Sequence, residues 1–280
     1  MRIAITATPS PPGAGPLLLW GDLQAAFRQA AEFGCQGVEI HFRNAEDLRP
    51  ETVKRLVADY GLQVPTLGTG MAAADGLSFS DPRPEIRART VERVRGHVEF
   101  AAAVRSAVTI GSLSGKLGPG SVAERHQRRA QALECLAEVC DVARRAGVTV
   151  LLEPLNRYEC DYINSLADFV SIAVEIGAPN LKLLADTFHM NIEEADMMAS
   201  LKAAKSFLGH VHLADTNRQA PGHGHLDIAA VLTTLDEIGY QGYLSFEVFP
   251  VPDARTAIRD GIAAVRAGLS KNRQELEARG

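Results

Sequence analysis

The segment Ala146-Gly147-Val148-Thr149-Val150-Leu151-Leu152-Glu153 contains, in order, the signals that decide the fold. An amphipathic stretch over residues 123–145 precedes Gly147, and glycine commonly follows a helix because it adopts the left-handed conformation without steric cost. A short apolar run comes next and ends at the carboxylate of Glu153. The segment therefore predicts a helix, a turn and a buried strand that carries an acidic residue at its carboxyl end.

The same order of elements recurs along the chain, for example in Phe33-Gly34-Cys35-Gln36-Gly37-Val38. Apolar, β-branched runs predict eight strands, at residues 2–7, 37–42, 63–68, 107–111, 149–153, 181–186, 210–214 and 243–248. Amphipathic stretches predict helices at residues 23–33, 50–60, 85–102, 123–145, 167–176, 227–238 and 254–269. Pro50 and Asp227 suit helix starts. Glycines suited to helix ends are Gly34, Gly61, Gly147, Gly177 and Gly239.

Alternation of strands and helices indicates a parallel sheet covered by helices. Eight units in 280 residues average 35 residues each, which fits a TIM (β/α)8 barrel forming a single domain over residues 1–280. A doubly wound open sheet is the main alternative, but the turn at residues 7–13 has no G-x-G-x-x-G pattern. In a barrel, the glycine-rich loops 68–84 and 112–121 belong to the catalytic face.

Composition narrows the class of protein. A content of 46% hydrophobic and 22% charged residues is typical of a globular chain, and a net charge of -5 argues against a nucleic-acid-binding surface. No apolar run approaches the ~20 residues of a membrane helix, and Met1-Arg2-Ile3-Ala4-Ile5 lacks the apolar core of a secretory signal. The four cysteines form no C-x-x-C pair, so we expect reduced thiols in a cytoplasmic protein with no nucleic-acid or membrane partner.

Four candidate metal ligands stand at or near the ends of successive predicted strands: Glu153, Asp186, His212 and Glu247. Their separations of 33, 26 and 35 residues each correspond to one strand–helix unit. Because the ends of neighbouring barrel strands share one rim, we expect the four side chains to converge. Three carboxylates and one imidazole suit Mn2+, Mg2+ or Co2+ better than a structural zinc ion.

Each of these residues alone has an ordinary explanation. An acidic residue at a strand end is more often a helix cap or a solvated loop residue, and a lone histidine is more often simply half-buried. The joint pattern favours a metal, because Glu153, Asp186 and Glu247 follow apolar runs in which an unpaired charge would be costly.

Further polar residues crowd the loops that follow these strands. Asn156 and Glu159 come after Glu153, His189 comes after the second candidate ligand, and Arg218 comes after the third. Bulky polar side chains in such loops fit a polar substrate of the size of a sugar. Taken alone, Arg218 is equally well explained as a surface arginine. For His189, an ordinary residue at a helix end is the weaker explanation, given the polar residues around it.

Four segments share a more specific pattern, namely Glu153-Pro154-Leu155-Asn156-Arg157-Tyr158-Glu159, Asp186-Thr187-Phe188-His189-Met190-Asn191, His210-Val211-His212-Leu213-Ala214-Asp215-Thr216-Asn217-Arg218 and Pro221-Gly222-His223-Gly224-His225. Together they resemble the xylose isomerase-like TIM barrels, in the branch typified by D-tagatose 3-epimerase and D-psicose 3-epimerase. Two further stretches, Gly68-Thr69-Gly70 and Asp75-Gly76-Leu77-Ser78, resemble 5-keto-L-gluconate epimerase more closely than they resemble the tagatose and psicose epimerases. The resemblance covers essentially the whole chain.

The resemblance implies that the four candidate ligands hold one divalent metal ion, with Mn2+ expected first and Mg2+ or Co2+ as alternatives. It implies that Glu153 and Glu247 also act as catalytic acid and base. It further implies that Glu159, His189 and Arg218 bind a small-molecule sugar substrate. Family members usually pair through their barrels, so we expect a homodimer or a homotetramer.

His210 does not match a ligand position of the family. It lies two residues before His212, so the alternation of a strand places both side chains on one face at different depths. We therefore expect His210 to pack inside the barrel.

These expectations combine into a metal-dependent epimerase that inverts C3 of a ketose or keto-sugar acid. A C–H group next to a ketone is only weakly acidic, so its proton is hard to remove. A metal chelated by the keto oxygen and the adjacent hydroxyl would help by stabilising the product of proton removal, a metal-bound cis-enediolate. Inversion needs proton removal on one face and return on the other. Glu153 and Glu247 close different strands, so they could carry out this two-carboxylate transfer from opposite sides.

Other functions remain open on this scaffold. An aldose–ketose isomerase, a hydroxypyruvate-type isomerase or a dehydratase would begin with the same proton abstraction. An endonuclease IV-like repair enzyme is more remote, because it needs about three metal ions and a basic surface, whereas this chain has eight histidines and a net charge of -5. A non-catalytic sugar- or metal-binding barrel would have little need of two convergent glutamates.

Overall fold

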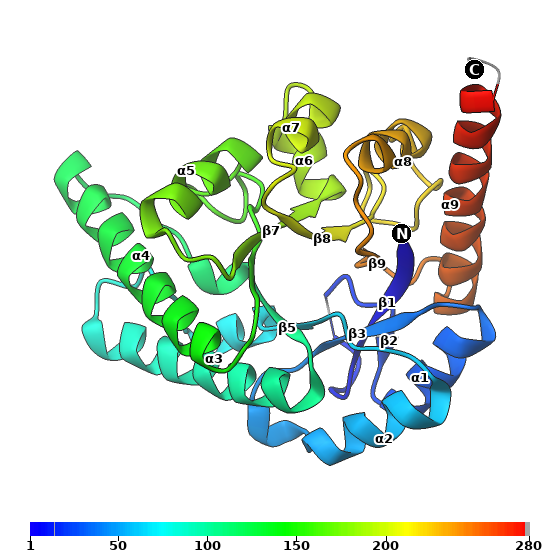
Figure 1. Ribbon diagram of the computed structural model, residues 1–280. Helices are drawn as coiled ribbons and strands as arrows, with labels where there is room; N and C mark the ends of the chain where they lie inside the picture. The colour runs from blue at the N-terminus through cyan, green and yellow to red at the C-terminus, as the bar shows by residue number, and fades with distance from the viewer. Residues whose placement is uncertain (14, 278–280) are drawn as a thin grey trace.

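Parallel strands close into a barrel because β1 (Arg2–Thr8) pairs with β9 (Tyr243–Phe246) as well as with β3 (Gly37–His41). The computed structural model describes residues 1–13 and 15–277. The barrel continues through β4 (Thr66–Gly68), β5 (Ala107–Ile110), β6 (Val150–Leu152), β7 (Leu181–Asp186) and β8 (Leu208–His212). The two-residue strand β2 (Leu19–Trp20) pairs with the carboxyl end of β1. The predicted TIM (β/α)8 barrel is confirmed (Figure 1).

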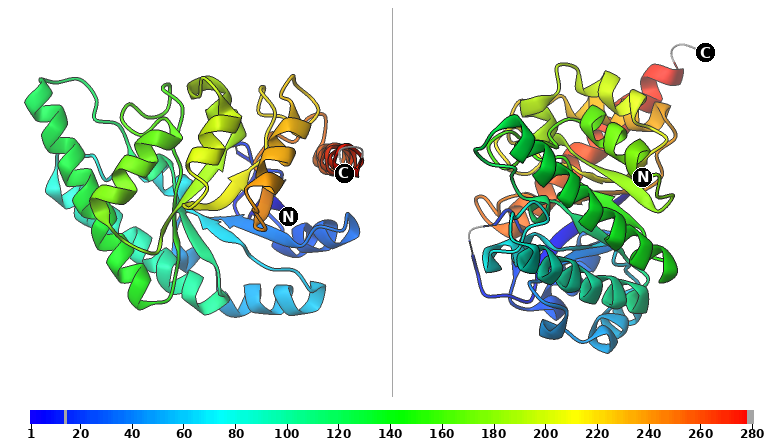
Figure 2. Two further views of the ribbon diagram at one scale, coloured as in Figure 1. Left: turned by 45° about the horizontal axis from the view of Figure 1, so that its top comes forward. Right: turned by 90° about the vertical axis from the view of Figure 1, so that its left-hand side faces the viewer.

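Helices surround the strands, as the views in Figure 1 and Figure 2 show. They are α1 (Leu23–Glu32), α2 (Pro50–Tyr60), α3 (Pro84–Val104), α4 (Val122–Arg145), α5 (Leu166–Ile176), α6 (Thr187–Glu193), α7 (Met197–Ala203), α8 (Ile228–Glu237) and α9 (Ala254–Glu277). Short 3-10 helices occur at η1 (Ala45–Asp47), η2 (Gly70–Asp75) and η3 (Ser112–Ser114). Within the part of the chain that the structure describes, no helix combines the length and the hydropathy needed to cross a membrane.

The sequence signals at helix ends act as expected. Pro50 is the first residue of α2, and the Asp227 carboxylate caps α8 by accepting a hydrogen bond from the backbone N–H of Ala230 at 2.9 Å. Gly61 and Gly177 end α2 and α5 in the left-handed conformation, at φ values of 65° and 67°. Each turn thereby sends the chain back towards the next strand.

Strand β3 shows how the barrel separates apolar from polar side chains. All five of its residues are buried. Val38 and Ile40 belong to the apolar core, whereas Glu39 and His41, at the alternate positions, make polar contacts with one another. Since successive side chains of a strand point to opposite faces, the barrel interior can be polar while its outer surface packs against the helices.

The sequence patterns miss the two short helices α6 and α7, which lie between β7 and β8. Each has seven residues, too few to show a clear helical repeat, and α6 contains the polar residues Thr187, His189 and Asn191. Its N-terminal cap is Asp186, whose Oδ1 accepts a hydrogen bond from the backbone N–H of Phe188 at 2.8 Å. A candidate metal ligand thus also starts a helix.

The packing of helices onto the barrel yields a stability prediction. Phe27 of α1 is fully buried in the core, so Phe27→Ala should lower the free energy of unfolding by about 3–5 kcal/mol. Val174→Ala on α5 is the matched control, because Val174 is 69% exposed and its truncation should change that free energy by less than about 0.5 kcal/mol. Denaturant titration followed by circular dichroism compares the two variants. Equal midpoints would contradict the assigned packing of α1.

Candidate metal centre

The four predicted ligands lie at the carboxyl ends of four adjacent strands. Glu153 directly follows β6, Asp186 ends β7, His212 ends β8, and Glu247 directly follows β9. Asp186 pairs in register with His212, which in turn pairs with Ser245. Residues far apart in the sequence therefore meet on one rim of the barrel.

The convergence is close. The Nδ1 atom of His212 lies 3.5 Å from Glu153 Oε1, 3.6 Å from Asp186 Oδ2 and 3.4 Å from Glu247 Oε2. The candidate ligand atoms all lie within 4.8 Å of one another. Three of the residues are buried, and the Glu247 side chain is 12% exposed.

Two atoms in this group fit the presence of a cation. Among the residues that the structure describes, Glu153 Oε1 and His212 Nδ1 are buried without a hydrogen-bond partner. Leaving such atoms unsatisfied costs about 1–3 kcal/mol each, and more when they are charged. A divalent ion among the four side chains would satisfy both, and three carboxylates with one imidazole form a donor set suited to a hard ion.

Arg218 supplies a positive charge at the same place. Its Nη1 donates a hydrogen bond to Asp186 Oδ2 at 2.6 Å, and its Nη2 donates one to Glu247 Oε2. Burial by itself raises the pKa of Glu247, but Arg218 and His212 outweigh it and lower that pKa to about 2. Burial raises the pKa of Glu153, with only partial compensation from His212. The two glutamates thus differ in the direction of their pKa shifts.

The predicted substrate-binding residues face one cavity of about 750 Å³. Glu159, His189 and Arg218 line it together with Glu153 and Glu247. Asn156 links two of them, because its amide nitrogen donates to Glu159 Oε1 at 2.9 Å and lies 2.8 Å from His189 Nδ1. His189 Nε2 lies 3.8 Å from both Glu153 Oε1 and Asp186 Oδ2, so its free ring edge faces the candidate ligands.

The glycine-rich loops after β4 and β5 also border this cavity, as the barrel topology predicts. Gly70 and Ser112 are among its lining residues. At Gly111, a Cβ atom would lie 2.6 Å from Glu153 Oε2, so the missing side chain leaves room for that carboxylate. The close approach explains why glycine stands there.

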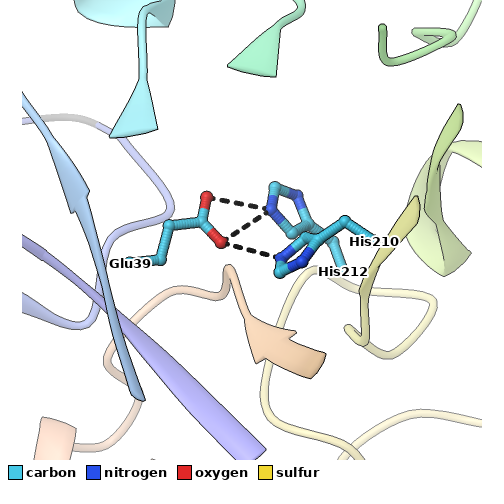
Figure 3. A group of neighbouring side chains, drawn as sticks. All are labelled: Glu39, His210 and His212. Carbon is cyan, nitrogen blue, oxygen red and sulfur yellow. Dashed lines mark hydrogen bonds and ion pairs between the residues drawn. The ribbon is translucent and has the colours of Figure 1, made fainter. Parts of the chain in front are cut away.

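Sequence reasoning missed Glu39, which is fully buried on β3 (Figure 3). Its carboxylate lies within hydrogen-bond distance of the Nε2 atoms of His41, His210 and His212. Burial raises its pKa, but the surrounding imidazoles outweigh burial and hold the pKa of Glu39 well below its usual range. The available signal was an acidic residue in the middle of a strand predicted to be buried.

A second missed residue, Asp215, organises the loop after β8. Asp215 is fully buried, and its carboxylate accepts backbone hydrogen bonds from Thr216 and Gly222 at 2.8 Å and from Leu226 at 3.0 Å. The Asp215 carbonyl accepts a bond from the backbone N–H of Arg218, which has a φ of 60°. The loop folds around this carboxylate and so brings the Arg218 guanidinium to the candidate ligands.

A family model described as the xylose isomerase-like TIM barrel matches residues 27–268. The chain belongs to the xylose isomerase-like TIM barrel family. The resemblance noted from the sequence motifs is therefore confirmed, and the branch of tagatose and psicose epimerases fits. The closer resemblance of this chain to 5-keto-L-gluconate epimerase stays a prediction.

Several relatives of the chain carry the names of epimerases. The chain is 31% identical to an L-ribulose 3-epimerase of Mesorhizobium japonicum over 81% of this chain and 76% of that protein. It is 33% identical to a 3-dehydro-D-guloside 4-epimerase of Escherichia coli over 86% of this chain and 92% of that protein. The prediction of an isomerase of the racemase and epimerase class agrees with both.

Solved structures of the family extend the comparison to nearly the whole chain. An L-ribulose 3-epimerase structure matches with a TM-score of 0.84 at 26% identity, covering 99% of this chain and 97% of that one. A 3-keto-D-glucoside 4-epimerase from E. coli matches with a TM-score of 0.80 at 28% identity, covering 95% of this chain and 100% of that one.

The Asp215 loop gives a prediction about pH and stability. Burial raises the pKa of Asp215, but the backbone N–H groups of Leu226, Thr216, Gly224 and Gly222 together outweigh burial and lower that pKa below its ordinary value. The ionised form therefore favours the folded state, and this contribution is present above the unfolded pKa of about 3.9 and is lost as the pH falls towards the folded pKa. Asp215→Asn should lower the free energy of unfolding at pH 7 by about 1–3 kcal/mol.

Denaturant titrations of the wild-type protein and Asp215→Asn between pH 7 and pH 3 would measure this difference. We expect the gap between the two proteins to narrow below about pH 4, because the unfolded wild-type chain then takes up a proton at Asp215 while the folded protein still holds the carboxylate ionised. A constant gap across this range would contradict the role of the ionised carboxylate.

Proposed function

We propose that this protein is a metal-dependent epimerase acting at C3 of a ketose or keto-sugar acid. The observation that carries the proposal is the convergence of Glu153, Asp186, His212 and Glu247, two of whose buried atoms have no hydrogen-bond partner among the described residues, beside a cavity of sugar-binding size that the two glutamates line. The 3-epimerase names of several relatives support the reaction type.

These four residues would hold one divalent ion, and Mn2+ is our first expectation, with Mg2+ or Co2+ as alternatives. When bound, such an ion supplies Lewis-acid stabilisation of the negative charge that develops on the substrate oxygens. The remaining chemistry belongs to the side chains around the cavity.

Glu153 and Glu247 carry the proton transfers in this proposal. Both line the cavity, and they follow β6 and β9, with β7 and β8 between them in the sheet. They can therefore approach a bound sugar from two sides. One carboxylate removes the proton from C3 to give an enediolate, and the other carboxyl group delivers a proton to the opposite face, which inverts the configuration.

Three further residues would bind and orient the substrate. Arg218 presents a buried guanidinium that stacks over the Phe188 ring, at 4.8 Å from its centroid, and this contact restricts its orientation. His189 Nε2 and the Arg218 guanidinium face the reacting end of the sugar and can donate hydrogen bonds to its oxygens. Glu159, held by Asn156, can accept a hydrogen bond from a substrate hydroxyl.

A second candidate is epimerisation at C4 of a keto-glycoside. The observation that favours it is the extent of the cavity, which continues past the metal centre to Trp20, Arg43 and Asp47 and could receive a second sugar ring. The E. coli 4-epimerase relative, which the chain matches over 92% of its length, supports this candidate. Product NMR on free ketoses and on 3-keto-glycosides, run side by side, separates the two.

We propose in addition that residues 1–280 form one domain, that the protein is cytoplasmic and that it assembles as a homodimer or homotetramer. Its partner is then a small sugar rather than a nucleic acid or a membrane. Light scattering coupled to size-exclusion chromatography measures the assembly directly.

Replacing either catalytic glutamate should stop the reaction. Glu153→Gln and Glu247→Gln each remove a proton-transferring group, so we expect kcat to fall by at least about 10²–10⁴-fold. The matched control is Glu175→Gln, since Glu175 is an exposed glutamate on α5 paired with Arg129, and its variant should keep the wild-type rate. A normal rate in Glu247→Gln would count against the two-carboxylate mechanism.

Removal of the metal should abolish turnover and also lower the thermal midpoint of unfolding, because an ion that binds only the folded state stabilises it. Treatment with a chelator, followed by addition of Mn2+, Co2+ or Mg2+, should restore both quantities. An enzyme whose activity and midpoint resist chelation would contradict the metal proposal.

Reaction in 2H2O identifies the carbon that exchanges its proton. Epimerisation at C3 should place deuterium at C3 of the ketose, read by product NMR. Deuterium at C1 alone would instead indicate an aldose–ketose isomerase, and loss of water would indicate a dehydratase.

A further inference from the structure

We infer that Glu39 is a positioning residue that orients His212 and fixes its tautomer, so that Nδ1 is the atom offered to the divalent ion. This inference rests on the proposed function, because it takes His212 as a metal ligand. Glu39 itself is not among the four residues that converge on the ion.

The contacts of His212 divide between its two ring nitrogens. Nε2 lies 3.0 Å from Glu39 Oε1 and 3.2 Å from Glu39 Oε2 (Figure 3). Nδ1, on the other side of the ring, faces the carboxylates of Glu153, Asp186 and Glu247 and has no hydrogen-bond partner within the described part of the chain. The ring therefore lies between one carboxylate behind it and three in front.

This arrangement selects one tautomer when an ion is bound. A nitrogen that ligates a metal carries no proton, so the proton of a neutral imidazole must sit on the other nitrogen. A carboxylate accepts hydrogen bonds but does not donate them. Glu39 therefore stabilises the proton on Nε2 and leaves the Nδ1 lone pair directed at the ion, and outer carboxylates of this kind strengthen metal binding.

Glu39 is itself held rigidly. It lies on β3, separated from β8 in the sheet by β1 and β9, so its side chain reaches across the barrel interior. His41 Nε2 lies 2.8 Å from Oε1, and His210 Nε2 lies 3.1 Å from Oε2. His210 in turn contacts Ser245 Oγ at 3.0 Å. These side contacts fix the carboxylate in the position that His212 needs.

The same residues raise a competing possibility, since Glu39, His210 and His212 are close enough to hold an ion of their own. Such an ion would need an unprotonated Nε2 on both histidines. His212 would then have to bridge two ions, one at each nitrogen. The number of ions bound per chain distinguishes this arrangement from the one we infer.

Metal affinity tests the inference without reference to catalysis. Wild-type protein and Glu39→Gln are stripped with a chelator, and Mn2+ binding is measured by calorimetry for its affinity and stoichiometry. The amide keeps the shape but loses one acceptor and the charge, so we expect one ion per chain in both proteins and an affinity weaker by about 10–100-fold in the variant. Glu175→Gln is the control: it makes the same amide replacement at an exposed glutamate on α5, outside this network, and should bind Mn2+ like the wild type.

A spectroscopic readout separates this role from general loss of structure. In 15N-histidine-labelled, Mg2+-loaded protein, NMR should show the His212 proton on Nε2, and Glu39→Gln should weaken or shift that signal. Glu39→Asp retains a carboxylate and should recover part of the Mn2+ affinity that Glu39→Gln loses. If Glu39→Gln does not fold, Glu39→Asp is compared with the wild type instead. We then expect a lower Mn2+ affinity for Glu39→Asp, with the His212 proton still on Nε2.

The remaining outcomes are distinct. Equal Mn2+ affinity in wild type and variant, measured in folded protein, overturns the role of Glu39 and leaves the proposed function standing. Two ions in the wild type and one in Glu39→Gln overturn it in favour of a second metal site. No Mn2+ binding by the wild type overturns the proposed function together with the inference.

Discussion

Three carboxylates gathered around one imidazole repel one another, and the balancing of their negative charge is the constraint on which the site depends. Glu153, Asp186 and Glu247 each place an oxygen within 3.6 Å of His212 Nδ1. Arg218 offsets part of the negative charge through two of the carboxylates. Within this group of four residues, Glu153 Oε1 and His212 Nδ1 are buried without a hydrogen-bond partner among the described residues, and they mark where an ion would contribute most.

The residues around this centre form supports on both sides of it. Inside the barrel, the Glu39 carboxylate contacts three histidines from two strands. In the loop after β8, the Asp215 carboxylate accepts hydrogen bonds from the backbone of the loop that carries Arg218. Neither residue faces the centre of the ligand group. Glu39 contacts His212, and Asp215 organises the loop that carries Arg218. Each is a fully buried carboxylate that is satisfied by several hydrogen-bond donors, as buried charges must be.

Family membership and local geometry answer different questions here. The xylose isomerase-like barrel fixes the rim on which the ligands stand. The wall of the cavity beyond that rim, with Trp20 and Arg43, sets the space available to a bound molecule. Relatives named for 3-epimerisation and for 4-epimerisation match this chain at similar levels of identity, so family membership by itself does not decide between the two reactions.

The sequence by itself determined the alternation of strands and helices, because glycine stops and apolar runs are local signals. It also placed the four candidate ligands at or near the carboxyl ends of β6 to β9, although the predicted and observed strand ends differ by one or two residues at three of these strands. It also pointed to Glu159, His189 and Arg218, which line the cavity with the ligands. It missed α6 and α7, whose seven residues are too few to show a period. Only the tertiary structure decided the partners of Glu39 and Asp215, since closure of the barrel brings β3 opposite β8, and the path of one loop wraps it around a single carboxylate. Such contacts depend on three-dimensional closure and leave no periodic trace in the chain.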